Sequence, residues 1–170
     1  MQIDSVEQNE LKPEWLFRLF ETAKAEHVSF EDRADAVTYV GRHHGYERLP
    51  DPVTHERALT LLKPSGELTI VDHLAGRGAH EVRWHFHMAP GVDVERVDVQ
   101  RADRCTLILA ARGRRWRFTI PPDLHLSIEP AWYSPSYGVR TRCLAINLGT
   151  RTNLGGSRHW EFSFQSAPGS

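Results

Sequence analysis

The feature that most constrains the fold is a series of short segments in which apolar and polar residues alternate, separated by turns rich in glycine and proline. Residues 67–91 show the pattern most clearly, as two alternating segments joined at a Gly-Arg-Gly turn. Side chains on a β-strand point to opposite faces in alternation. The second segment therefore places Arg83, His85 and His87 together on one face. This pattern predicts a half-buried antiparallel hairpin with a polar outer face.

The same pattern recurs along most of the chain and predicts an all-β fold. Short strands separated by turn signals are typical of an antiparallel β-sandwich or barrel, and we favour a β-sandwich of about ten strands. We expect one domain spanning residues 1–170, least regular over residues 1–35 and ending in a tail at 166–170. The predicted strands are 36–40, 53–62, 67–74, 79–88, 92–99, 104–111, 115–120, 124–128, 139–147 and 160–164.

Three stretches depart from this pattern. Apolar residues at helical spacing after Pro13 predict a short amphipathic helix over residues 13–25. Residues 41–52 contain two glycines and two prolines, which favours a loop. The apolar alternation changes parity at Glu95 and Arg96, which predicts a bulge or a break.

Composition excludes several classes of protein. Hydrophobic residues make up 40% of the 170 residues, and no apolar run approaches the roughly 20 residues that span a bilayer. We therefore expect no membrane span, and no signal peptide is recognisable. Nucleic acid is not an expected partner, because the formal net charge is −1 and the arginines alternate with inward residues. Cys105 and Cys143 lie in apolar segments, and we expect them to be small buried residues. The sequence does not decide whether they form a disulfide with each other.

A metal site is one of three chemical interpretations of the histidines. His85 and His87 share a strand face, and cupin-type jelly rolls use such a pair with a third ligand. A cupin would place a glutamate a few residues later, but the first acid downstream is Asp93. We therefore expect no metal and no other cofactor, and keep a cupin-like metal-binding jelly roll as the third hypothesis. The third ligand would come from His43, His44, His55 or His125.

The other two interpretations are acid–base chemistry and ligand binding. Histidine and tyrosine side chains transfer protons in many enzymes, but isolated aromatic residues in such loops more often anchor the loop. Motifs of nucleophile elbows, phosphate loops and zinc proteases are not present in the sequence. Outward arginines with loop aromatics would instead hold an anionic sugar. The arginines concerned are Arg83, Arg115, Arg117, Arg140 and Arg142, and the aromatics are Trp132, Tyr133 and Tyr137.

Several motifs in one order resemble the carboxy-terminal β-sandwich of the heparinase II/III-like polysaccharide lyases. The resemblance covers nearly the whole chain and also places sandwich chain, in place of a helix, over residues 13–25. It is carried by HGYERLP at 44–50, PVTHER at 52–57, VDHLAGRGAHE at 71–81, FHMAPG at 86–91 and WYSPSYG at 132–138, with Asp4, Glu7 and Gln8 near the start.

The resemblance implies a function but transfers no catalytic residue. Similar enzymes cleave uronate polysaccharides by β-elimination in a cleft between an α-helical toroid and the sandwich. Their catalytic segment and metal ligands correspond to chain before Met1, so we expect an isolated or shortened form that is inactive without the toroid. The resemblance suggests a periplasmic or cell-envelope location for a full-length protein.

The expected partners are an acidic polysaccharide and a helical toroid domain. Homo-oligomer formation and a free-standing acidic-carbohydrate-binding module stay open as alternatives. The resemblance assigns His55, Asp72, His87 and Tyr137 first to support of the sheets and loops. The predicted substrate-binding residues are Arg83, His85, His87, His44, Tyr46, Tyr133 and Tyr137.

Overall fold

The computed structural model describes residues 1–15, 18–97 and 105–167 as an all-β protein with one short 3-10 turn. Each predicted alternating segment forms a strand, and further strands form near the amino terminus. The strands are β1 (Gln2–Ile3), β2 (Glu26–Asp32), β3 (Ala36–Tyr46), β4 (Val53–Leu62), β5 (Glu67–Gly76), β6 (Ala79–His87), β7 (Asp93–Val97), β8 (Cys105–Ala111), β9 (Arg114–Ile120), β10 (His125–Ser136), β11 (Val139–Asn153) and β12 (Gly156–Ala167).

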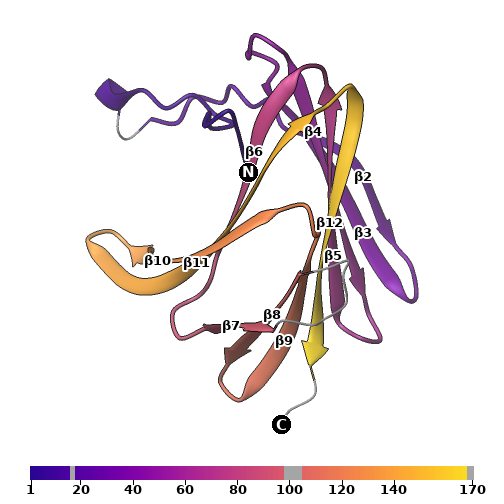
Figure 1. Cartoon of the computed structure of the whole chain (residues 1–170), viewed down its shortest axis with the longest axis vertical. Coiled ribbons are helices and arrows are strands. Elements are labelled where there is room, and N and C mark those ends of the chain that lie inside the picture. The colour runs from indigo at the N-terminus through magenta and orange to yellow at the C-terminus, as the bar shows by residue number, and fades with distance from the viewer. Residues whose placement is uncertain (16–17, 98–104, 168–170) are drawn as a thin grey trace.

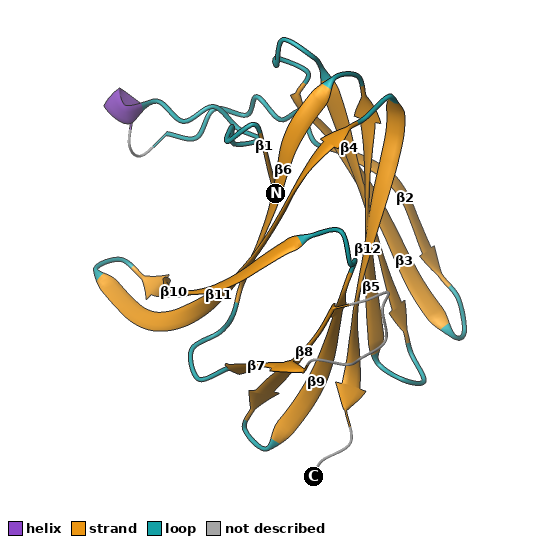
Figure 2. Ribbon diagram, in the orientation of Figure 1, coloured by secondary structure: helices purple, strands orange, loops and turns teal. Residues whose placement is uncertain are grey.

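These strands form two antiparallel sheets that pack as a sandwich (Figures 1 and 2). The smaller sheet has four strands in the order β1-β6-β11-β10, and the larger has eight in the order β2-β3-β4-β5-β12-β9-β8-β7. The hairpin over residues 67–91 is divided between the sheets, since β5 belongs to the larger and β6 to the smaller. The predicted all-β sandwich is confirmed.

The core lies between the two sheets and is rich in aromatic rings. Trp84 of β6 packs edge-on against Trp160 of β12 with ring centroids 5.1 Å apart. Two residues further along β6, the ring centroid of Phe86 lies 5.1 Å from that of Phe118 and 5.4 Å from that of Phe162. Aromatic side chains bury a large apolar area each, and such edge-to-face pairs add to that contribution. These contacts fix the position of β6 over β12 and β9.

The predicted helix over residues 13–25 is reduced to a 3-10 turn at Pro13–Trp15, and residues 16 and 17 lie outside the described part. Trp15 and Leu19 are exposed and only Ala23 is buried among the described residues of the apolar stripe, so little of the stripe packs against the core. A helix this short is marginal without tertiary packing. Local periodicity was therefore misleading in this segment.

Two further local predictions differ from the structure. The predicted loop at 41–52 is a strand as far as Tyr46, because Tyr46 is fully buried and extends the sheet with a register shift between His43 and Tyr46. Over Asp93–Val97 the pairing with β8 shows no register shift, so the expected bulge is not found there. Residues 98–104 and 168–170, including parts of two predicted strands and of the predicted tail, lie outside the described residues. The first two residues of the predicted tail, Ser166 and Ala167, end strand β12 instead.

Both cysteines are free thiols, Cys143 buried and Cys105 partly buried. The two thus form no disulfide, and they pack as small side chains. Among the described residues, no helix has the length and hydropathy needed to cross a bilayer.

Candidate functional site: a polar groove on the four-stranded sheet

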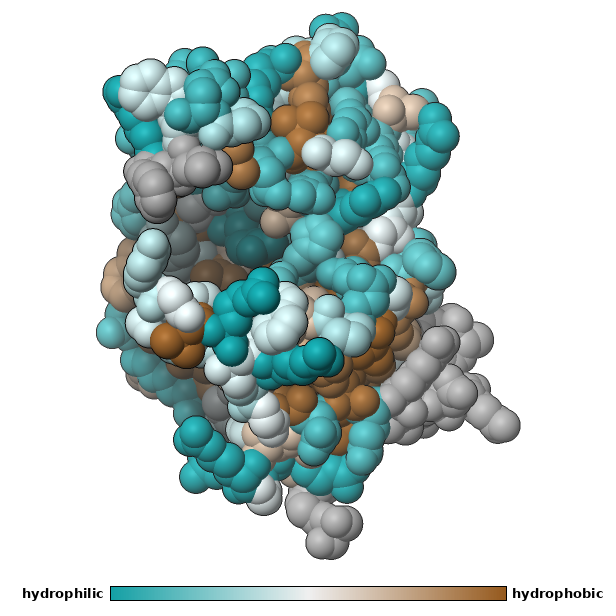
Figure 3. All heavy atoms as spheres, turned by 90° about the vertical axis from the view of Figure 1, so that its left-hand side faces the viewer, coloured by the Kyte–Doolittle hydropathy of each residue, from teal (hydrophilic) through white to brown (hydrophobic). Residues whose placement is uncertain are grey.

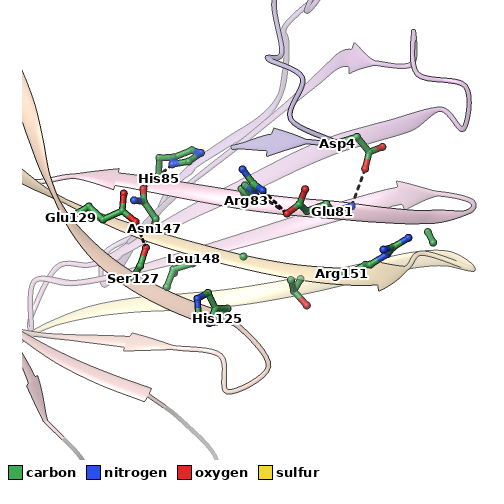
Figure 4. Close-up of a pocket in the computed structure, with 13 residues that line it drawn as sticks. Asp4, Glu81, Arg83, His85, His125, Ser127, Glu129, Asn147, Leu148 and Arg151 are labelled. Atoms are coloured by element: carbon green, nitrogen blue, oxygen red, sulfur yellow. Dashed lines mark hydrogen bonds and ion pairs between the residues drawn. The ribbon is translucent and has the colours of Figure 1, made fainter.

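A groove of about 960 Å³ runs over the outer face of the four-stranded sheet. Residues that alternate with core residues on β6, β10 and β11 line it, so the same alternation that builds the core presents polar groups outside. Figure 4 shows these side chains along the three strands. They include Glu81, Arg83 and His85 from β6, His125, Ser127 and Glu129 from β10, and Asn147 and Arg151 from β11, with Asp4 at one end.

The pairing of β6 with β11 fixes the middle of the groove. His85 lies directly opposite Asn147, and its Nδ1 is 2.8 Å from the Asn147 Oδ1. The other ring nitrogen of His85 is 3.2 Å from the Gln2 Oε1. Contacts on both sides of the ring hold the imidazole in one orientation, and the Arg83 Nη2 donates to the Glu81 Oε1 at 2.6 Å beside it.

The charge of the groove is mixed. Asp4, Glu81 and Glu129 supply three carboxylates, and Arg83 and Arg151 supply two guanidinium groups. Such a surface offers hydrogen-bond donors and acceptors in similar number. It suits a ligand that is rich in hydroxyl groups and also carries negative charges.

Two projections flank the groove. One is the far end of the β10–β11 hairpin, and the other is the amino-terminal arm around Trp15. Figure 3 looks onto this side of the molecule, whose surface is hollowed between them. At the hairpin the guanidinium of Arg140 lies 4.5 Å from the ring centroid of Trp132, and that of Arg142 lies 5.3 Å away. Tyr137 at its tip is 96% exposed. The hairpin thus joins aromatic surface with positive charge.

A buried polar cluster lies on the opposite side of β6, inside the sandwich. Asp72 is fully buried and accepts from Arg57 Nε at 2.6 Å, Arg57 Nη2 at 2.7 Å and Trp84 Nε1 at 2.8 Å. Its Oδ1 is also 2.7 Å from His55 Nε2. Burial alone would raise the pKa of Asp72, but the hydrogen bonds from His55 and Arg57 hold that pKa well below its usual range. The carboxylate therefore stays charged and ties β4, β5 and β6 together.

The cluster extends to His43 through a chain of hydrogen bonds in which each group donates to the next, ending at Asp72. The amide of Gly45 donates to His43 Nδ1 at 3.2 Å, which leaves His43 Nε2 to donate to His55 Nδ1 at 2.9 Å. His55 then donates to Asp72 from Nε2. Burial, with the neighbouring His55 charge, lowers the pKa of His43 to about 4. His43 is thus neutral near pH 7, and each ring nitrogen of the two histidines has a partner.

Comparisons with known proteins show the family of the chain. The family model described as "Heparinase II/III-like, C-terminal" matches residues 5–160. This chain belongs to that family. No curated protein matched the chain.

Solved lyases share the fold of this heparinase II/III-like domain. Heparan sulfate lyase HepC from Pedobacter heparinus superposes with a TM-score of 0.69 at 14% identity, over 85% of this chain and 22% of the lyase. A heparinase III gene product superposes with a TM-score of 0.67 at 15% identity, over 86% of this chain and 22% of that protein. At such low identity the likeness shows the fold. The domain spans about a fifth of the length of these lyases.

The structure brings together only some of the residues predicted for substrate binding. Arg83 and His85 lie in the groove, and His87, two residues further along the same strand, is exposed. Tyr133 and Tyr137 are exposed on the hairpin. Arg83, His85 and His87 thus share one face of β6, and the two tyrosines lie on the hairpin of β10 and β11.

His44 and Tyr46 lie elsewhere. The Nδ1 of His44 lies 2.6 Å from the Glu47 Oε1, and its Nε2 lies 3.1 Å from the Glu26 Oε1. These two carboxylates raise the pKa of His44. Tyr46 is fully buried, and its hydroxyl donates to the Met1 carbonyl at 2.6 Å. His55 and Asp72, assigned to sheet support, form the buried cluster described above.

Asn147, Ser127 and Arg151 were missed by sequence reasoning. Their alternation on β10 and β11 marks them as outward residues, but only the strand pairing shows that they line one groove with Arg83 and His85. His125, considered only as a metal ligand, lies at the same groove. Across residues 1–15, 18–97 and 105–167, no three His, Cys, Asp or Glu side chains are grouped to hold a metal ion.

Proposed function

We propose that this heparinase II/III-like domain binds acidic, uronate-containing polysaccharide in the groove on its four-stranded sheet. The observation that carries the proposal is the row of hydrogen-bonding side chains around Arg83, His85 and Asn147, on the outer face of a sandwich of this family. Sugar hydroxyls both donate and accept, as the groove does. Arg83 and Arg151 would bind carboxylates, because guanidinium groups form two-pronged hydrogen bonds with them.

The aromatic hairpin supports a polymer as the ligand. Tyr133 is half-exposed beyond the last groove residues of β10 and offers a ring face on which a sugar can stack. Arg140 and Arg142 add positive charge on the Trp132 side of the same hairpin. A chain longer than the groove would contact both regions.

In this proposal the domain supplies binding and not the chemical step. β-Elimination needs a base next to the uronate carboxylate, a group that neutralises that carboxylate, and an acid for the leaving oxygen. We assign these groups to a helical domain outside residues 1–170. The purified domain should then yield no unsaturated uronate from heparin or alginate, as measured by absorbance of the product.

Calorimetry with heparin, alginate and neutral dextran tests the binding. We expect heat for the acidic polymers only, and a loss of affinity of about tenfold for Arg83→Ala, the size of one charge-assisted hydrogen bond. Arg117→Ala removes the same charge from the outer face of the other sheet and is the matched control. Equal losses for the two variants, or no binding of any acidic polymer, would reject the groove as the site.

The runner-up function is a free-standing acidic-carbohydrate-binding module, favoured by the Trp132, Arg140 and Arg142 cluster. It predicts binding by the domain alone that depends more on Arg142 than on Arg83. The same calorimetry with Arg142→Ala separates the two functions.

A further inference from the structure

The floor of the groove has a gap at Gly149 of β11. The strand register places Arg83 of β6 directly opposite Gly149 on one side and His125 of β10 directly opposite it on the other. Opposed residues of neighbouring strands share one face of the sheet, so Arg83 and His125 flank a position that has no side chain. Figure 4 shows these two residues on the strands either side of β11. A Cβ added at Gly149 would meet nothing nearer than 3.8 Å, so the described residues leave the space above it unfilled.

The row of residues next to the gap supplies neutral hydrogen-bonding groups. Asn147 lies two residues before Gly149 on β11, between His85 of β6 and Ser127 of β10. Its Oδ1 contacts His85 Nδ1 at 2.8 Å, and its side-chain NH2 has no partner among the described residues. Ser127 donates to the Glu129 Oε1 at 2.7 Å, so its oxygen can still accept. These groups match sugar hydroxyls, which both donate and accept.

The charged side chains beside the gap do not balance. Arg83 donates to the Glu81 Oε1 from Nε at 3.0 Å and from Nη2 at 2.6 Å. Glu81 also lies directly opposite Arg151, whose exposed guanidinium has no hydrogen-bond or ion-pair partner within the described part of the chain. The Asp4 carboxylate is occupied by His80 and by the Glu81 amide. Two guanidinium groups therefore share one carboxylate, and one positive charge is left over.

We propose that the space above Gly149 is a subsite for one uronate carboxylate, which replaces Glu81 as the partner of Arg83. The displaced Glu81 side chain then pairs with Arg151, because opposed residues have Cβ atoms only about 4.5–5.5 Å apart. Hydroxyl groups of the same sugar contact His125 and the neighbouring neutral row. The inference rests on the proposed function and adds to it the position of the charged group.

The chemistry of the subsite selects a carboxylate. A neutral sugar gains no charge-assisted hydrogen bond and leaves the pair of Arg83 and Glu81 in place. A carboxylate compensates the one remaining positive charge and accepts two parallel hydrogen bonds from the planar guanidinium group. A sulfate ester carries the same single charge without the planar shape, so the experiment compares the two groups.

The requirement for a carboxylate is tested with matched ligands. An alginate oligosaccharide carries only carboxylates as charged groups, and its methyl ester keeps the hydroxyl groups without the charge. Calorimetry on the unmodified domain should show about tenfold weaker binding of the ester, as for the loss of one charge-assisted hydrogen bond. Tighter binding of a sulfated dextran oligosaccharide of equal length than of the alginate oligosaccharide would overturn the choice of a carboxylate.

Two substitutions with opposite expected effects locate the subsite. Gly149→Val fills the gap without a change of charge, and the strand tolerates it because valine favours strands and an added Cβ is not crowded. The alginate oligosaccharide should then bind as weakly as its ester. Glu81→Gln removes the competing carboxylate and should strengthen binding of the alginate oligosaccharide about threefold, the size of an exposed ion pair. Ala75→Val, on the eight-stranded sheet, is the control for added bulk and should leave binding unchanged.

The outcomes separate this subsite from the proposed function. If the unmodified domain binds no acidic polymer, the proposed function fails and the subsite fails with it. If the domain binds alginate but Gly149→Val keeps the preference for the acid over the ester, the subsite alone is wrong. Equal losses in Gly149→Val and Ala75→Val, or unchanged or weaker binding by Glu81→Gln, would also overturn the subsite.

Discussion

The two faces of the four-stranded sheet use the same strands for different purposes. On the inner face, Val82, Trp84 and Ile146 are almost completely buried and join the sheets. On the outer face, Arg83 and His85 alternate with them along β6 and remain exposed. Because neighbours in sequence point in opposite directions, stability and ligand contact can be changed separately. The difference predicts large stability losses from inner substitutions and binding losses from outer ones.

The largest expected effect is from Asp72→Asn in the buried cluster. The neutral amide cannot accept from His55, Arg57 and Trp84 together, and it leaves the partly buried Arg57 charge without a counterion. Removing one partner of such a cluster should lower the free energy of unfolding by about 3–5 kcal/mol. Urea denaturation measures this loss.

Asp32→Asn is the matched control, because Asp32 is exposed and pairs with Lys63 at 2.5 Å on the surface. Its loss should be below about 1 kcal/mol. If the two substitutions cost the same, the buried cluster does not hold the sheets as described.

A smaller effect is expected from acid titration of His43. Its folded pKa of about 4 lies below the ordinary 6.5, so the unfolded chain binds the extra proton first as pH falls. Stability is therefore fully present above about pH 6.5 and decreases towards pH 4, at about 1.4 kcal/mol for each unit of pKa difference at most. His43→Gln should show a weaker decrease in that window, measured by urea denaturation at several pH values. An identical pH profile in the variant would contradict the assignment.

The smallest stability effect is expected on the outer face. Arg83→Ala, His85→Ala and Asn147→Ala each remove exposed or half-exposed contacts and should change the free energy of unfolding by about 0.5 kcal/mol or less. Their affinity for heparin should nevertheless fall, with Arg83→Ala the most affected. Thermal unfolding with and without heparin measures both quantities, and destabilisation of the free protein as large as for Asp72→Asn would remove the distinction between the faces.

Most of the fold could be predicted from alternation and turn chemistry. The turn at Gly78, for instance, has a positive φ of 85°, and an added Cβ there would lie 2.7 Å from the Asp51 carboxylate. Alternation also separated Trp84 from Arg83. It failed where tertiary packing decides, because the segment after Pro13 has helical spacing but leaves Trp15 and Leu19 exposed. It also failed at Tyr46, whose glycine-rich surroundings resemble a loop although its ring is in the core.

The site was less accessible to sequence reasoning because it depends on strand register. His85 and Asn147 are 62 positions apart, and only the pairing of β6 with β11 places them opposite each other. The same holds for the division of residues 67–91 between two sheets. Local pattern indicates which residues point outward, but it does not indicate which strands are neighbours.

The most direct test of the central claim is an NMR titration of the isotope-labelled domain with a heparin oligosaccharide. We expect shift changes at outward residues of β6, β10 and β11, centred on Arg83, His85 and Asn147, that follow one binding isotherm. Changes centred instead on the outer face of the eight-stranded sheet, around Arg117, or no changes at saturating oligosaccharide, would contradict it.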